Sequence, residues 1–98
     1  MEIIKNQNGT SLEISVEGRL DTMTAPAFES EISSAINGIT SLVLDFAKLE
    51  YVSSAGLRVI LSAQKTMNKQ GEMKIKNVNS EIMDVFEITG FSDILTIE

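Results

Sequence analysis

The chain opens with two segments whose residue pattern predicts paired strands. In the segment 11–17, apolar and polar residues alternate, and this period of two buries one face of a strand and leaves the other in solvent. A shorter strand is predicted over 2–5. The turn over 6–9 contains an Asn-Gly pair, which supplies the positive φ of a tight turn. The two segments therefore predict an antiparallel hairpin.

Three later segments have the spacing of apolar residues that is typical of amphipathic helices. Each has a Ser, Thr or Asn where a helix N-cap belongs and a glycine where a helix ends. The predicted limits of the three helices are Thr24 and Gly38, Ser53 or Ser54 and Gly71, and Asn79 and Gly90.

Short apolar runs between the helices predict further strands. The segment 41–46 is apolar on successive positions, as in a central strand, and strands are also expected over 72–77 and 94–97. We expect loops over 18–21 and after the strand 41–46. The order β-β-α-β-α-β-α-β predicts a single α/β domain over 1–98. Its mixed sheet has four or five strands, with the helices packed mainly on one side.

The composition excludes several kinds of catalytic and metal site. The 98 residues include 8 Lys and Arg and 14 Asp and Glu, for a formal net charge of −6, and there is no His, Cys or Trp. Without His and Cys, catalytic Ser-His or Cys-His pairs and the usual zinc sites are excluded. We expect no cofactor and no metal. We also expect no nucleic-acid partner, because an acidic chain is a poor match for phosphate backbones. No membrane span or signal peptide is recognisable, which predicts a cytoplasmic protein.

Candidate chemistry concentrates around the start of the second helix. A serine at a helix start is commonly an N-cap, which explains one of Ser53 and Ser54 but not both. Gly56 in the first turn costs about 1 kcal/mol relative to Ala and indicates close approach by another backbone or a partner. We expect Asp21 and Asp45 to lie at the C-terminal ends of strands adjacent to the start of this helix, at the edge where α/β folds collect binding residues. Each aspartate fits a local role in its turn equally well.

These residues resemble the STAS domain family, and the match is closest to the bacterial anti-sigma factor antagonists. The resemblance covers essentially the whole chain, in order. It lies in two motifs, Gly18-Arg19-Leu20-Asp21 with Thr24-Ala25, and Asp45-Phe46, Leu49 and Tyr51 with Ser53-Ser54-Ala55-Gly56-Leu57-Arg58-Val59. The family often has Asp where Ser53 stands, and Ser or Thr where Ala55 stands, so modification of Ser53 stays open.

The resemblance implies a protein-binding switch. In such proteins the serine at the position of Ser54 is phosphorylated by a partner that is both an anti-sigma factor and a serine kinase. The unphosphorylated protein sequesters this partner and so releases a sigma factor. The resemblance further implies a serine phosphatase that resets the switch, no catalysis by the chain itself, and a monomer in the free state. The expected partner-binding residues are Asp21, Asp45, Ser53, Ser54, Gly56 and Arg58.

Arg58 lies four residues after Ser54, on the same helical face, and either pairs with the phosphate or is a solvated surface charge. Two other classes of function remain open. In one, the chain is a non-enzymatic STAS subunit of a transport or signalling complex, for example in lipid transport, and Ser54 is only a contact residue. In the other, Ser54 is an enzyme nucleophile, although the sequence places no base to activate it.

Overall fold

Strands and helices alternate after an opening hairpin in the computed structural model, which describes residues 1–98. The strands are β1 (Glu2–Asn8), β2 (Ser11–Leu20), β3 (Ser41–Asp45), β4 (Leu49–Val52) and β5 (Glu72–Lys76). The helices are α1 (Ala25–Ala35), α2 (Ser54–Gln70) and α3 (Ser80–Thr89), and a short 3-10 helix, η1 (Phe91–Asp93), follows α3.

The five strands form one mixed sheet, organised around β2. β1 pairs with β2 in antiparallel fashion, and β3 and β4 both pair with β2 in parallel. β2 is long enough for both partners: β3 pairs with Ser11–Ser15, and β4 pairs with Gly18–Leu20. β3 and β4 therefore lie one after the other along the same side of β2, and β5 pairs with β3.

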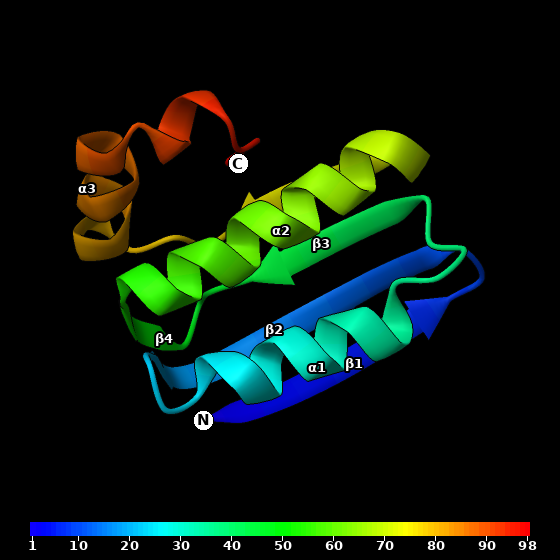
Figure 1. Cartoon of the computed structure of the whole chain (residues 1–98), viewed down its shortest axis with the longest axis horizontal. Coiled ribbons are helices and arrows are strands. Elements are labelled where there is room, and N and C mark those ends of the chain that lie inside the picture. The colour runs from blue at the N-terminus through cyan, green and yellow to red at the C-terminus, as the bar shows by residue number, and fades with distance from the viewer.

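The two longest helices, α1 and α2, run side by side across one face of the sheet, while α3 lies beside β4 at one end (Figure 1). Alternate strand residues face the helices and are buried, including Leu12, Ile14 and Val16 of β2. The residues between them face away and form ion pairs such as Glu13 with Lys76, at 2.6 Å. The predicted α/β fold, with its mixed sheet and its helices on one side, is confirmed.

Three expectations from the sequence are wrong, and two of them concern residues that pair with or form β4. The segment 18–21 is not a loop, since Gly18–Leu20 continue β2 and pair with β4. The residues after Asp45 do not form the predicted loop either, because they contain β4. In this strand only the two end residues are buried, so no alternation of apolar and polar residues marks it. The segment 94–97 forms a single parallel bridge, Ile75 to Ile97, rather than a strand.

The helix starts follow the sequence with one difference. Ser53 is the N-cap of α2, and Asn79 caps α3 by accepting a hydrogen bond from the Ile82 N–H at 2.9 Å. Thr24 precedes α1 as predicted, but its hydroxyl does not cap the helix. Instead this hydroxyl accepts a hydrogen bond from the Asp21 N–H at 2.9 Å and donates to the Arg19 carbonyl at 2.8 Å. Thr24 therefore ties the loop to the end of β2.

Candidate functional site

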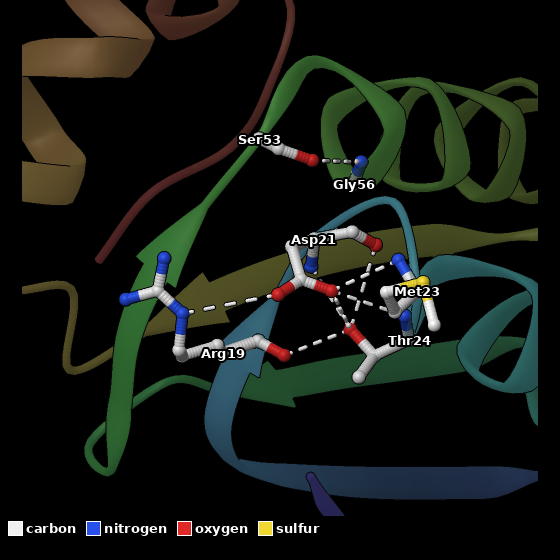
Figure 2. Close-up of polar contacts among 6 residues, drawn as sticks. All are labelled: Arg19, Asp21, Met23, Thr24, Ser53 and Gly56. Carbon is white, nitrogen blue, oxygen red and sulfur yellow. Dashed lines mark hydrogen bonds and ion pairs between the residues drawn. The ribbon is translucent and has the colours of Figure 1, made fainter.

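The N-terminal ends of α1 and α2 lie at the same edge of the molecule, where β2 and β4 end (Figure 1). Leu20 and Val52, the last residues of these two strands, are partners in the sheet. The chain leaves β2 through residues 21–24 and leaves β4 through residues 53–58, and these two segments lie against each other (Figure 2). We call them together the α2 corner.

The two serines of the α2 corner have different surroundings. Ser53 is half-buried, and its hydroxyl accepts a hydrogen bond from the Gly56 N–H at 3.4 Å (Figure 2). Its backbone N–H also donates to the Leu20 carbonyl at 2.9 Å, so the residue joins α2 to β2. Ser54 is exposed at the first position of α2, and its hydroxyl makes no hydrogen bond. Ser54 therefore presents a free hydroxyl to solvent, whereas Ser53 serves the helix.

Gly56 is buried where α2 crosses the ends of β2 and β4. A Cβ at this position would lie 2.7 Å from Leu20 Cγ and 3.0 Å from Val52 Cγ2. Both distances are shorter than the roughly 3.5–4.0 Å at which carbon atoms pack. The space that we expected another backbone or a partner to fill is therefore filled by the chain's own core. Gly56 allows α2 to pack closely on the sheet and is not part of the exposed surface.

Asp21 holds the loop 21–24 in one conformation (Figure 2). Its Oδ1 accepts hydrogen bonds from the N–H groups of Met23 at 3.0 Å and Thr24 at 3.1 Å. Its Oδ2 lies 3.8 Å from Nε of Arg19, whose guanidinium group stacks on Tyr51 at 4.3 Å from the ring centroid. Desolvation acts to raise the pKa of Asp21, but the hydrogen bonds and Arg19 outweigh it and hold the pKa below its ordinary value.

The ordered loop exposes residues that the sequence did not single out. Thr22 is exposed, and the side chain of Met23 is 87% exposed, the largest fraction for any apolar residue of that size in the chain. A hollow of about 230 Å³ lies between the starts of α1 and α2, with Thr22, Glu29 and Arg58 in its lining. Met23 could not be distinguished from other loop residues by pattern, because its exposure depends on how Asp21 folds the loop.

Asp45 lies away from the α2 corner. It ends β3 opposite Ser15 of β2, while the α2 corner begins after Leu20. These two positions on β2 are separated by roughly 16 Å, at about 3.3 Å per residue. The prediction that both aspartates lie beside the start of α2 is therefore wrong for Asp45. The cause is β4, which carries the chain further along β2 before α2 begins.

Asp45 closes a turn of its own, formed by residues 45–48 and Asn77, which we call the β3 corner. Its Oδ1 accepts hydrogen bonds from the Ala47 N–H at 3.0 Å and from Nδ2 of Asn77 at 2.9 Å. Desolvation acts to raise the pKa of Asp45, but these hydrogen bonds and the nearby Lys76 hold it below its ordinary value. Asp45 thus fills the local role that its sequence position left open.

In the structure, no group of three or more His, Cys, Asp or Glu side chains is placed to hold a metal ion. A second hollow, of about 240 Å³, lies at the β3 corner and includes Glu17, Asp45 and Lys48 in its lining. Its carboxylates are engaged, since Glu17 pairs with Lys48 at 3.0 Å and Asp45 closes its turn. None of the helices is both long and apolar enough to span a bilayer.

Comparison with known proteins identifies close relatives of this chain. The family model described as STAS domain matches residues 2–98. An anti-sigma-B factor antagonist of Listeria monocytogenes is 33% identical over 98 residues, which cover 97% of this chain and 85% of that protein. A solved structure of an anti-sigma factor antagonist from Mycobacterium paratuberculosis has a TM-score of 0.89 and 21% identity, covering 98% of this chain and 83% of the other.

A further solved structure comes from the anti-sigma factor antagonist SpoIIAA of Bacillus, which is known in two states. Its unphosphorylated form has a TM-score of 0.79 and 19% identity, covering 99% of this chain and 87% of the other. Its phosphorylated form has a TM-score of 0.77, with coverage of 99% and 91%. At this level of identity, the likeness shows that the fold is shared.

Proposed function

The chain belongs to the STAS domain family, and from this premise we infer that it is an anti-sigma factor antagonist. In its unphosphorylated state it binds an anti-sigma factor that has serine kinase activity, and this binding releases a sigma factor. Phosphorylation of Ser54 ends the binding, and a serine phosphatase restores it. The kinase and the phosphatase carry the chemistry, so the chain acts by binding alone. Since sigma factors work in the cytoplasm, the proposal places the protein there.

One observation supports Ser54 as the phosphate acceptor: of the two adjacent serines, it alone is exposed with an unbonded hydroxyl. The kinase would transfer the γ-phosphoryl group of ATP to Ser54 Oγ. A new O–P bond forms as the bond to the β-phosphate oxygen breaks, and the hydroxyl proton passes to a base of the kinase. Ser53 Oγ is engaged by the Gly56 N–H and is less accessible to such an enzyme.

The position of Ser54 explains how phosphate could block binding without unfolding the protein. A phosphoryl group adds about −1.5 to −2 charges at pH 7. The N-terminal end of α2 tolerates this charge, because free N–H groups and the helix dipole favour an anion there. A partner that desolvates the same surface would bury an unmatched charge, at a cost of several kcal/mol. The fold is thus preserved while the interface is lost.

The proposed partner surface is the exposed part of the α2 corner. Met23 offers apolar area of the kind enriched in protein interfaces, and Ser54 and Arg58 lie on the adjacent turn of α2. Asp21 stays charged in a fixed loop, which suits it to recognise a cationic side chain of the partner. Ser53 supports this surface as the cap of α2. Gly56 and Asp45 have structural roles in the proposal.

The decisive test compares the same added charge at two exposed positions. Pull-down from a lysate of the source bacterium identifies the anti-sigma factor, and titration calorimetry then measures its binding. We expect Ser54→Asp to fold with a melting temperature near that of the parent but to bind at least tenfold more weakly, which corresponds to about 1.4 kcal/mol. The matched control is Ala47→Asp at the exposed β3 corner, which should bind like the parent.

Two results would contradict the proposed function. If Ser54→Asp binds as tightly as the parent, charge at this site does not control the complex, and the role of a STAS subunit in a transport complex is favoured. The second concerns the acceptor itself: after incubation with the kinase and ATP, mass spectrometry should place phosphate on Ser54. Phosphate found only on Ser53 would overturn the assignment.

A further inference from the structure

We propose that Arg58 forms an ion pair with the phosphate on Ser54 and holds it, doubly charged, against the first turn of α2. This inference rests on the proposed phosphorylation of Ser54 and concerns how the chain itself receives the phosphate. It depends on helix geometry, on the free charge of Arg58, and on the absence of a competing acidic residue in the first turn of α2.

The geometry of α2 brings the two side chains together. Residues four apart in a helix lie one above the other on the same face. The Cα–Cβ bonds of a helix also tilt toward its N-terminus, so an arginine at position 58 can extend its side chain back over the turn that begins at Ser54. The planar guanidinium group has donors spaced to bind two phosphate oxygens at once.

Arg58 is available for this role because it has no partner in the unmodified chain. Five of the eight Lys and Arg residues form ion pairs with acidic residues. The three that do not are Arg58, Lys65 and Lys69, and all of them lie on α2. Of these, Arg58 is the one within reach of the first turn. An exposed and unpaired arginine can therefore turn to a new anion without breaking an existing contact.

The surrounding charges do not compete effectively with a phosphate. Glu29 of α1 lines the same hollow as Arg58 but forms no ion pair with it. Asp21 is held by its own loop and by Arg19, and the first turn of α2 contains no acidic residue. A phosphate can carry nearly twice the charge of a carboxylate and so attracts the guanidinium group more strongly.

The ion pair would favour the doubly charged phosphate over the singly charged one. The second pKa of phosphoserine is ordinarily about 6, and a neighbouring guanidinium group lowers it. At neutral pH the modified protein would then present its full negative charge, at a fixed place on the α2 corner. Arg58 would thus sharpen the difference between the two states of the switch.

The test is a phosphorus NMR titration of the full chain with phosphoserine installed at position 54 during biosynthesis. In low salt, we expect Arg58→Ala to raise the pKa of the phosphate by about 0.3 relative to the parent, as for a helical ion pair at this spacing. Arg58→Lys should give a smaller rise, because lysine keeps the charge but loses the two-pronged geometry. The matched control is Lys65→Ala, which removes a charge from the same helix beyond reach of the phosphate and should leave the pKa unchanged.

The proposal is overturned if Arg58→Ala titrates like the parent, or if Lys65→Ala shifts the pKa as much as Arg58→Ala does. Both substitutions are at exposed positions of a helix, and melting curves of the unphosphorylated variants establish that they fold. Because phosphoserine is installed without a kinase, the titration measures Arg58 independently of whether a kinase modifies Ser54. A failed kinase assay would therefore contradict the proposed function but leave the ion pair standing.

Discussion

Asp21 and Asp45 each hold a turn in place, at two different corners of the sheet. In the α2 corner, Asp21 accepts a hydrogen bond from the N–H of Met23, two residues on. In the β3 corner, Asp45 accepts one from the N–H of Ala47, also two residues on. Both carboxyl groups have a lowered pKa for the same reason, since each is fixed by hydrogen bonds. As turns, the two corners are nearly equivalent.

What separates the corners is their place relative to α2. If β3 led directly into α2, the helix would begin beside Asp45. Instead, β4 pairs with the far end of β2, so the helix begins beside the loop that Asp21 holds. Only the α2 corner therefore combines an ordered loop with a helix start, a free serine and an unpaired arginine. An acidic residue after a strand does not by itself mark a binding site.

The largest difference between the two corners should be the loss of stability when a residue in each is replaced by a larger one. Gly56→Ala places a methyl group 2.7 Å from Cγ of Leu20, which is itself fully buried. Overpacking costs about 1–3 kcal/mol, which outweighs the gain in helix propensity of up to about 1 kcal/mol. Urea unfolding should show a clear loss of stability. Ala47→Val in the exposed β3 corner should change stability by less than about 0.5 kcal/mol, and an equal loss there would contradict the argument.

Removing each aspartate tests whether only one corner binds the partner. Asp21→Ala and Asp45→Ala should both lower the melting temperature by roughly 4 °C, because each variant loses its turn hydrogen bonds. Only Asp21→Ala should weaken binding of the anti-sigma factor, by about fivefold or more. Titration calorimetry measures the difference. Equal weakening by Asp45→Ala would show that the partner surface extends to the β3 corner.

Within the α2 corner, replacing Ser53 should lower the stability of the fold more than replacing Ser54. Ser53→Ala removes the cap of α2 and should cost about 0.5–1 kcal/mol, at the low end because the capping bond is long, at 3.4 Å. Ser54→Ala removes an unbonded hydroxyl and should change stability by less than about 0.5 kcal/mol while keeping partner binding. Urea unfolding of the two variants would reverse the assignment if Ser54→Ala were the less stable.

The smallest expected effect concerns the loss of folding stability at low pH, to which both corners should contribute alike. Both aspartates have a folded-state pKa below the unfolded value of about 3.9. Each therefore stabilises the fold above that pH, and the contribution is lost as the pH falls through the folded pKa. Asp21→Asn and Asp45→Asn should each lose less stability than the parent between pH 5 and about pH 2. Urea unfolding across this range would contradict the equivalence if only one variant became less sensitive to acid.

Local patterns of residues are enough to predict the elements whose signals span only a few positions. The alternation in β2 and the glycines that end α2 and α3 act over a few residues, so their pattern is visible without tertiary context. The same holds for the segment that carries the candidate site. Ser53 and Ser54 stand at the start of the helix, and this position alone predicts that one of them is its cap.

Tertiary structure decided everything that depends on what lies beside a residue. β4 has four residues and becomes a strand only because the end of β2 supplies its hydrogen-bond partners, about 30 residues earlier in the chain. That pairing moved Asp45 away from the start of α2 and placed Leu20 against Gly56. It also left Ser54 exposed while Ser53 joined α2 to β2. The spacing of apolar residues and the neighbours in sequence predict which helix or strand a residue belongs to. Contacts between segments that are distant in sequence arise only when the chain is packed.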